Sequence, residues 1–442
     1  MPVDDPASET VVAEVAAAGP SEVVEAVAAA VEAGGGWAAR SPPERGAALA
    51  GYARLLDEHA EELASIMHRE MGKPAGEAAA EVARALEVVH YFAAEAERLV
   101  VTQLPGPTLA TGSWTRPAPI GVVAAIVPWN VPVALVLWKL APALAAGCPI
   151  LVKPAIEAPL AIHRLCELAD EAGLPPGLVN CLTGDGPLIG EALSIHPDVA
   201  KVAFTGSRRV AEQIAAWAAP RLKALTLELG GHGSLIVLPG ADLDRVHEIA
   251  TVQGFANAGQ ACYSVNRVIA DPGVADRIAD RLADGLADLA LGPMATDRGV
   301  TRHDALLADA REKGATVVGG GSSVGRRVEP AVITGAGPGV DVIDDEPFTP
   351  IVSVMEIGGV EAQLAEANRP DYGLVSYVVG PDMRQALEVA QRVTSGTVVI
   401  NGWRVVVPYA PYGGWQGSGL GTELGRPGMD AFLRWQHLRV LA

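Results

Sequence analysis

The stretch GVVAAIVPWNVPVALVLWKLAPALAAGCPILVKP, residues 121–154, alternates short aliphatic runs with a long apolar segment. The aliphatic runs, residues 120–127 and 149–153, predict buried strands, and residues 133–146 between them predict a buried helix. Residues 117–138 carry no charge and would be long enough to span a bilayer. The prolines and asparagine of PWNVP in their middle favour a strand, a turn and a helix, so no membrane span is predicted.

The same alternation continues downstream. The next predicted strands are LVNCLTG (178–184), KVAFTG (201–206) and ALTLELGG (224–231), and the predicted helices are residues 158–172, 186–194 and 208–219. A second series runs from about Ser234 to Asn401, with strands at SLIVL, RVIA, ATVVGG, IVSVMEI, SYVVG and TVVIN. Such alternation is typical of a parallel, doubly wound sheet, so the predicted fold class is α/β with two domains.

The first hundred residues predict helices. Ser41 with Glu44 forms a capping-box pattern at the start of one helix, which is expected to end at Gly72 and Pro74. Between this region and the first strand, TGSWTRPAP (111–119) predicts an extended connector or a hairpin arm.

Composition narrows the class of protein. The chain has 442 residues and a net charge of -19, which would repel phosphate backbones and anionic membrane surfaces, so neither nucleic acid nor a membrane is an expected partner. Four cysteines, without CxxC or Cys/His spacing, indicate no disulfide framework and no metal site. The acidic start MPVDDPASET indicates no export signal, and a reducing, cytoplasmic setting is predicted.

One cysteine lies among small and polar residues, in GFANAGQACYSVNRV (254–268). A cysteine taken alone is more often buried packing than a reactive group. Gly259, Gln260, Ser264 and Asn266 around Cys262 predict an irregular polar loop, where a thiol can be held accessible. Cys262 is therefore a candidate nucleophile.

Two further residues are candidates for chemistry. Glu228, in the apolar strand LTLELGG, is either a buried carboxylate with a raised pKa that suits a general base or a carboxylate paired with a cation. Asn130, at the turn in IVPWNVP, is either an oxyanion donor or an ordinary turn asparagine.

Phosphate binding is possible at two glycine-bearing strand-to-helix turns, TGDGPLIG (183–190) and FTGS (204–207), although neither is the dinucleotide fingerprint. Lys153, at the end of PILVK, either reaches a ribose or phosphate or is a solvated lysine.

Taken together, these motifs resemble the aldehyde dehydrogenase superfamily from about residue 8 to the C-terminus. The matching motifs, in order, are PWN (128–130), VKP (152–154), GLPPG (173–177), FTGS (204–207), LELGG (227–231), GQ-x-C (259–262), E-x-F-x-P (346–350), N-x-x-x-YGL (368–374) and PYGG-x-x-x-SG-x-G (411–421).

The resemblance implies an aldehyde dehydrogenase-like α/β fold. It implies a Rossmann-type dinucleotide-binding domain from residues 1–100 and 120–230, and an α/β catalytic domain over 231–417. A small oligomerisation arm would come from residues 101–119 and 428–442, which implies a homodimer or homotetramer.

The resemblance also implies NAD(P)-dependent oxidation of an aldehyde to the carboxylic acid. Cys262 would attack the aldehyde, the Asn130 amide would hold the thiohemiacetal oxyanion, and Glu228 would activate the water that hydrolyses the thioester. The implied cofactor residues are Trp129, Lys153, Ile156, Gly186, Gly206, Ser207, Leu229, Glu346 and Phe348. The implied substrate residues are Val131, Leu135, Trp138, Tyr263, Trp403, Arg404, Val406 and Tyr412.

This sequence departs from the family pattern near the nucleotide. Ile156 stands where an acidic residue commonly accepts the adenosine ribose hydroxyls, which favours NADP more than the family default does. Glu157 could substitute by a local shift, so the sequence leaves the choice between NAD and NADP open. Arg208 and Arg209 predict a more cationic nucleotide edge. Ala211, Thr349 and Gln416 also depart from the family pattern, and the segment between Cys262 and Glu346 is shorter than usual.

Aromatic and aliphatic substrate positions favour an apolar or aromatic aldehyde, whereas Arg404 would either bind a substrate carboxylate or lie solvated at the rim. Two alternative functions stay open from the sequence. In the first, a CoA-acylating dehydrogenase, a thiol would take the acyl group from the cysteine thioester. In the second, the altered nucleotide positions would leave a catalytically impaired family member with a binding role.

Overall fold

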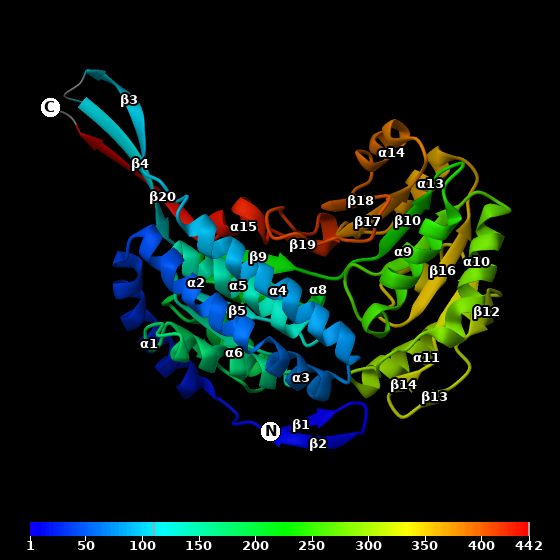
Figure 1. Ribbon diagram of the computed structural model, residues 1–442, viewed down its shortest axis with the longest axis horizontal. Helices are drawn as coiled ribbons and strands as arrows, with labels where there is room; N and C mark the ends of the chain where they lie inside the picture. The colour runs from blue at the N-terminus through cyan, green and yellow to red at the C-terminus, as the bar shows by residue number, and fades with distance from the viewer. Residues whose placement is uncertain (109–110, 441–442) are drawn as a thin grey trace.

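The computed structural model describes residues 1–108 and 111–440, arranged as two helix-covered β-sheets and a projecting three-stranded arm (Figure 1). The first sheet has six strands in the order β19-β9-β8-β5-β6-β7. Their bounds are β5 Val122–Ile126, β6 Ile150–Lys153, β7 Val179–Cys181, β8 Val199–Thr205, β9 Ala224–Glu228 and β19 Gly419–Leu420. All neighbours are parallel except β19, which pairs antiparallel with β9. The predicted parallel sheet is confirmed.

Both faces of this sheet are covered, which explains why its central strands are apolar throughout. Alternate side chains of β5 pack either with α1, α7 and α8 or with α5 and α6, so every residue of β5 is buried. The helices are α1 Pro20–Ala39, α5 Pro132–Ala146, α6 Leu160–Glu171, α7 Gly186–Ile195 and α8 Arg208–Ala218.

The N-terminal region differs from the prediction in two places. It begins with a hairpin, β1 Pro2–Asp5 and β2 Thr10–Glu14, before α1. The helix expected from Ser41 to Gly72 is two helices, α2 Pro42–Glu58 and α3 Ala60–Met71, which meet at His59 without a glycine or proline to announce the break. The capping box at Ser41 is confirmed, and α4, Ala75–Ala96, follows.

The second sheet has seven strands in the order β12-β15-β16-β11-β10-β17-β18. They are β10 Gly233–Val237, β11 Val265–Ala270, β12 Thr316–Gly319, β15 Ala331–Thr334, β16 Ile351–Glu356, β17 Val375–Val379 and β18 Thr397–Ile400. All six predicted strands are present; β15 was not predicted, and β12 pairs antiparallel with it. The helices are α9 Leu243–Phe255, α10 Val274–Gly285, α11 Asp297–Glu312, α12 Asp341–Asp344, α13 Val360–Ala367 and α14 Met383–Ala390. A small hairpin, β13 Ser323–Val324 and β14 Arg327–Val328, lies beside α11.

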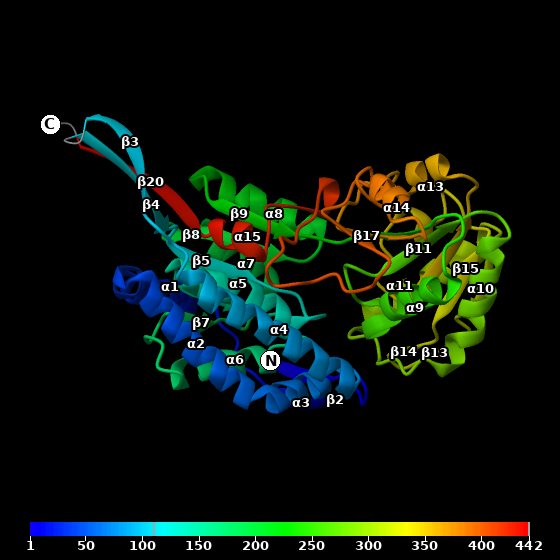
Figure 2. The same cartoon turned by 45° about the horizontal axis from the view of Figure 1, so that its top comes forward.

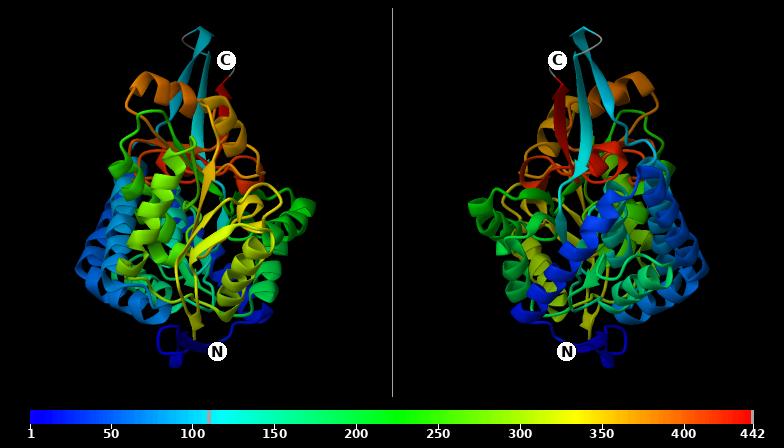
Figure 3. Two further views of the ribbon diagram at one scale, coloured as in Figure 1. Left: turned by 90° about the vertical axis from the view of Figure 1, so that its right-hand side faces the viewer. Right: turned by 90° about the vertical axis from the view of Figure 1, so that its left-hand side faces the viewer.

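The arm is an antiparallel sheet of β3 Thr102–Thr108, β4 Thr111–Pro119 and β20 Leu433–Val440, which follows α15 Gly425–Asp430. It extends away from the two-sheet body in every view (Figures 1, 2 and 3). Of the two structures considered for residues 111–119, the hairpin arm is therefore the one observed. The uncharged segment 117–138 is divided among β4, β5 and α5, and no helix in the described part of the chain has the length and apolarity to cross a bilayer.

Candidate active site

Cys262 lies in the loop between α9 and β11, at the junction of the two sheets, and is half-buried. A short turn, Ala256–Gly259, precedes it with Asn257 and Ala258 in the left-handed region. Gly259 has φ +71°, and a Cβ there would lie 2.1 Å from the Thr349 carbonyl oxygen, so only glycine fits. The Gln260 side chain fixes the turn by donating to the Asn257 carbonyl (2.9 Å) and accepting from the Ala295 amide (2.9 Å).

Asn130 lies against this loop. Its Nδ2 donates to the Gln260 carbonyl at 3.0 Å, and its own carbonyl accepts from Lys73 Nζ at 2.9 Å and Asn257 Nδ2 at 3.0 Å. This hydrogen bond fixes the buried Asn130 amide against Gln260, which precedes the candidate nucleophile Cys262 by two residues. A fixed N–H donor of this kind suits a developing oxyanion.

The Cys262 thiol has a polar neighbour in Tyr412, whose hydroxyl lies 3.5 Å from Sγ. Burial raises the pKa of Cys262 well above its usual range, and the nearby Glu228 carboxylate adds to this, whereas the Tyr412 hydrogen bond opposes it. The thiol therefore rests in its protonated form at neutral pH.

Glu228 ends β9 and is 1 % exposed. Within the described residues neither of its carboxylate oxygens has a hydrogen-bond partner. Burial raises its pKa well above the usual range, and the Glu423 carboxylate adds to this effect. The nearby cation, Lys139, makes its ion pair with Glu423 at 2.8 Å. Of the two interpretations left open for Glu228, this geometry favours the buried base over the ion-paired carboxylate.

Several of the predicted cofactor residues gather at the carboxyl edge of the first sheet, where the strands lead into helices. Trp129 follows β5, Lys153 ends β6, Gly186 begins α7, and Gly206 with Ser207 precedes α8. Lys153 Nζ lies 3.8 Å from where a Cβ of Gly186 would be, so a buried ammonium faces the start of α7. A cation beside a helix N-terminus fits a phosphate group, and this edge is where parallel sheets bind nucleotides.

Glu346 and Phe348 bring the E-x-F-x-P loop to the same edge. The Gly231 amide donates to Glu346 Oε1 at 3.1 Å, and burial raises the pKa of Glu346 to about 8. A Cβ on Gly230 would lie 2.2 Å from Glu346 Oε2, so a larger residue there would displace the Glu346 carboxylate. The Phe348 ring meets the Trp129 ring edge to face, with centroids 5.8 Å apart.

Two departures near the nucleotide edge can be placed. Ile156 lies in the turn before α6, partly buried, and offers no side-chain acceptor. Arg208 makes ion pairs with Glu212 (3.1 Å) and Asp371 (2.7 Å). The charge of Arg208 is therefore offset in part by these two carboxylates. Leu229 is buried beside it, with its amide donating to the Ser418 carbonyl at 3.0 Å.

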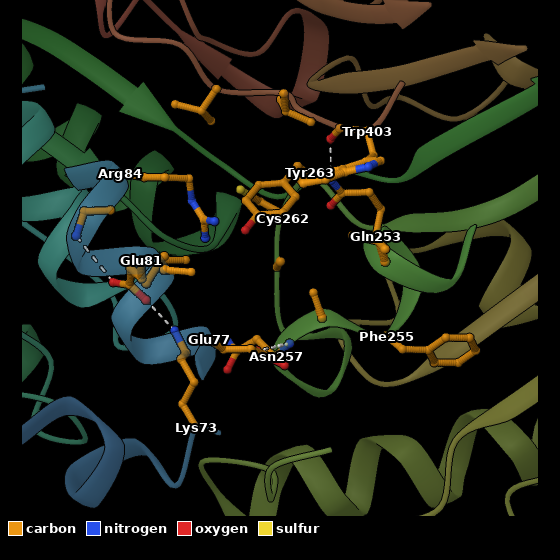
Figure 4. A pocket seen from close by; sticks show the side chains of 18 of the residues that line it. Lys73, Glu77, Glu81, Arg84, Gln253, Phe255, Asn257, Cys262, Tyr263 and Trp403 are labelled. Carbon is orange, nitrogen blue, oxygen red and sulfur yellow. Dashed lines mark hydrogen bonds and ion pairs between the residues drawn. The ribbon is translucent and has the colours of Figure 1, made fainter. Parts of the chain in front are cut away.

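A cavity of about 490 Å³ opens next to Cys262 (Figure 4). Seven of the eight predicted substrate residues line it, namely Val131, Leu135, Trp138, Tyr263, Trp403, Arg404 and Val406. Tyr412 does not line it; its ring packs edge to face on Trp138, 5.2 Å between centroids.

Sequence reasoning missed much of the lining of this cavity, including the wall that α4 and the residues just before it provide. Lys73, Glu77, Glu81 and Arg84 line that wall. Glu77, Glu81 and Arg84 have the i, i+4, i+7 spacing of one helix face, a pattern that usually indicates a solvated surface. The helical spacing of these residues can be read from the sequence, but the sequence pattern does not show which part of the fold faces α4.

Comparison with known proteins agrees with this geometry. A sequence model described as the aldehyde dehydrogenase family matches residues 1–438. The chain belongs to that family. It is an NAD(P)-dependent aldehyde dehydrogenase and oxidises an aldehyde to the acid.

Among its relatives is the NADP(+)-dependent succinate-semialdehyde dehydrogenase GabD of Escherichia coli (strain K12), 34 % identical over 99 % of this chain and 94 % of that protein. The 3-sulfolactaldehyde dehydrogenase of Pseudomonas putida is also 34 % identical, over 99 % and 92 %. The crystal structure of succinate-semialdehyde dehydrogenase from Burkholderia pseudomallei superposes with a TM-score of 0.97, at 36 % identity over 100 % and 94 % of the two chains. These relatives give no support to a CoA-acylating or a non-enzymatic role.

Proposed function

We propose that Cys262, Asn130 and Glu228 carry out this oxidation, on an aldehyde whose far end carries an anionic group. The observation that carries the catalytic assignment is the arrangement around one loop, in which the Asn130 amide is hydrogen-bonded beside Cys262 and the buried Glu228 carboxylate has no partner of its own.

The chemistry follows from these side chains. The Cys262 thiol gives its proton to solvent, its sulfur attacks the aldehyde carbon, and the Asn130 amide donates to the oxygen that becomes negative. A bound nicotinamide would supply the hydride acceptor for this oxidation, and the acyl group would remain on the Cys262 sulfur. Glu228, once deprotonated, takes a proton from water, and the water oxygen adds to the acyl carbon. The bond between that carbon and the Cys262 sulfur then breaks, which releases the carboxylic acid.

We assign the cofactor to the unit formed by residues 1–100 and 120–230, and the catalytic loop to the unit of residues 231–417. Lys153 with Gly186 would hold a phosphate or ribose, Glu346 the nicotinamide ribose, and Trp129, Gly206, Ser207, Leu229 and Phe348 the remaining contacts. Ile156 leaves the adenosine ribose without a carboxylate acceptor, which favours NADP over NAD.

The substrate class rests on two observations. Two relatives are named for succinate semialdehyde and 3-sulfolactaldehyde, which both carry an anionic group. The cavity beside Cys262 combines apolar walls with arginines, a combination that suits an aliphatic aldehyde with a distal anion.

The state of the protein in the cell is part of the same proposal. The arm presents exposed apolar side chains on β20, which supports a homodimer or homotetramer. The net charge of -19 and the free cysteines support a cytoplasmic enzyme that binds neither nucleic acid nor membranes.

The test is the rate of reduced-cofactor formation with NAD and NADP in parallel, on succinate semialdehyde, butanal and benzaldehyde. We expect the highest kcat/KM with succinate semialdehyde and NADP, and no turnover by Cys262→Ala with any aldehyde. Turnover that survives Cys262→Ala would refute the nucleophile, and equal kcat/KM for succinate semialdehyde and butanal would refute the substrate class.

A further inference from the structure

The substrate cavity contains several charged side chains, and most of them are already engaged. Lys73 is buried, pairs with Glu81 and donates to the Asn130 carbonyl. Its charge therefore supports the backbone of the oxyanion turn. A substrate anion at Lys73 would have to displace a buried carboxylate, which is costly.

Glu77 is engaged with the catalytic loop. Its Oε2 accepts from the Asn257 amide at 2.9 Å, next to the turn that precedes Cys262. Burial raises the pKa of Glu77, while the charges of Lys73 and Arg84 oppose that shift. Since both acidic groups of this wall already have protein partners, the wall offers little to a substrate ammonium group.

Arg404, the arginine singled out from the sequence, is also engaged. Its guanidinium lies 3.2 Å from Glu87 Oε2, and its side chain is 58 % exposed. Glu87 lies on α4 outside the cavity lining, so the pair lies at the mouth. This position matches a solvated rim arginine better than a substrate anchor.

Arg84 is different from these groups. It lines the cavity from α4, and among the described residues it makes no hydrogen bond and no ion pair. Figure 4 shows its guanidinium directed across the cavity toward Cys262 and Tyr263. Burial raises the pKa of the Tyr263 hydroxyl, and the positive charge of Arg84 opposes that rise. The two side chains are therefore close enough to interact electrostatically.

A guanidinium carries five N–H donors in a planar fork that matches a carboxylate or a sulfonate. Arg84 is exposed and lines the same cavity as Trp138, Tyr263 and Trp403, so its fork is accessible to an anion that enters the cavity. The apolar walls would carry the alkyl part of the substrate between the anion and the reacting carbon.

We propose that Arg84 binds the distal anionic group of the aldehyde substrate and thereby sets the enzyme's preference for ω-anionic over neutral aldehydes. This inference rests on the proposed substrate class and names the residue that determines it. Arg84 is a specificity residue, since it takes no part in the bonds that change.

The experiment compares Arg84→Met, Arg404→Met and, as a matched control on an exposed helix face away from the cavity, Arg54→Met. Each is assayed with succinate semialdehyde, a sulfonate-bearing aldehyde of similar length, and butanal. The readout is the ratio of kcat/KM for each anionic aldehyde to that for butanal, with kcat and KM separated.

In Arg84→Met we expect the ratio to fall roughly 10- to 100-fold, the range for loss of a hydrogen bond to a charged group, through KM rather than kcat. Arg84→Lys should recover part of it, because a point charge replaces the fork. Arg404→Met and Arg54→Met should leave the ratio within about 2-fold. A larger fall with the carboxylate than with the sulfonate would identify the anion.

An unchanged ratio in Arg84→Met, or a fall in Arg404→Met instead, would overturn the assignment of Arg84 while leaving the substrate class standing. A wild-type enzyme without preference for anionic aldehydes would overturn both together. Because Arg84 has no protein partner among the described residues, its replacement should leave the thermal unfolding temperature unchanged, and this separates lost binding from lost folding.

Discussion

At the scale of single residues, burial raises the pKa of both the proposed nucleophile, Cys262, and the proposed base, Glu228. A buried carboxyl with a raised pKa is unreactive as a base at low pH and becomes effective only as the pH rises through that pKa. Glu228 should therefore control how turnover depends on pH.

We expect kcat to keep rising with pH above the pKa of an ordinary glutamate, following deprotonation of Glu228, rather than to reach a plateau near that pKa. In Glu228→Gln this rise should disappear and kcat should fall roughly 10²- to 10⁴-fold, the usual contribution of a general base. The measurement is a kcat–pH profile of both proteins. A wild-type profile already flat from pH 5 upward would contradict the role of Glu228.

Asn130→Ala should lower kcat roughly 10²- to 10³-fold, as expected when one oxyanion donor is removed. The Asn130 backbone carbonyl would still accept from Lys73 and Asn257, so the turn should survive the change. Thermal unfolding checks the fold and steady-state kinetics check the effect. A change in KM alone would point to substrate binding instead of oxyanion stabilisation.

The thiols should differ in reactivity in a way that the sequence does not show. The hydrogen bond from Cys166 lowers the pKa of Cys181 to about 6, with further help from His163, whose Nε2 lies 4.0 Å away. Burial raises the pKa of Cys148 to about 11 and that of Cys262 well above its usual range. Without cofactor at pH 7, iodoacetamide should label Cys181 first, because the thiolate is the nucleophile.

Mass spectrometry of the labelled peptides checks this order. Cys181→Ala should remove the fastest phase of labelling and leave the slower Cys262 phase in place. Faster labelling of Cys262 than of Cys181 in the cofactor-free protein would show that burial does not hold the Cys262 thiol protonated.

At the scale of elements, most of the fold was predictable because aliphatic runs and helical spacing recur in strict alternation. The failures have physical causes. The break at His59 between α2 and α3 carries no proline or glycine, and β15 is a run of only four residues, Ala331–Thr334, whose burial comes from its neighbours in the sheet. The hairpin before α1 is short and polar, so its sequence resembles a loop.

The same reasoning explains which part of the site was found. Cys262, Glu228 and Asn130 lie in motifs that can be recognised locally, whereas Arg84 shares its helix face with glutamates and resembles a solvated residue. Only the packing of α4 against α5 turns that face into a cavity wall, and no local pattern specifies that contact.

The capping box of α2 allows a test at this scale. The Ser41 hydroxyl lies 3.4 Å from the Glu44 amide, and Glu44 Oε2 accepts from the Ser41 amide. Ser41→Ala should destabilise the protein by about 0.5–2 kcal/mol. Ser207 also precedes a helix but makes no cap bond, so Ser207→Ala is the control and should cost less. Equal shifts of the two unfolding temperatures would contradict the assignment.

At the scale of the whole molecule, the arm exposes several large apolar side chains on one strand, β20. Trp435, Leu438 and Val440 are 57 %, 44 % and 50 % exposed. Side chains of this kind on a projecting sheet are expected to be covered by another copy of the chain.

Leu438→Glu with Trp435→Glu should therefore reduce the mass of the particle in solution, as measured by light scattering after size exclusion. Val324→Glu, at an exposed valine on β13 at the opposite end of the molecule from the arm (Figure 1), should leave the mass unchanged. A wild-type protein that already runs as a monomer, or an unaltered mass in the double variant, would refute the oligomeric proposal.

The pairing of β19 with β9 and of β20 with β4 has a consequence for how the chain is made. The first sheet and the arm are built largely from residues before 230, yet each takes its last strand from residues after 418. During synthesis the N-terminal part emerges first, but the edges of β9 and β4 stay uncovered until the ribosome releases the end of the chain. The enzyme must therefore protect the β4 edge from about residue 119 and the β9 edge from about residue 228 until the last residues are made, and a truncation near the C-terminus should harm solubility as well as assembly.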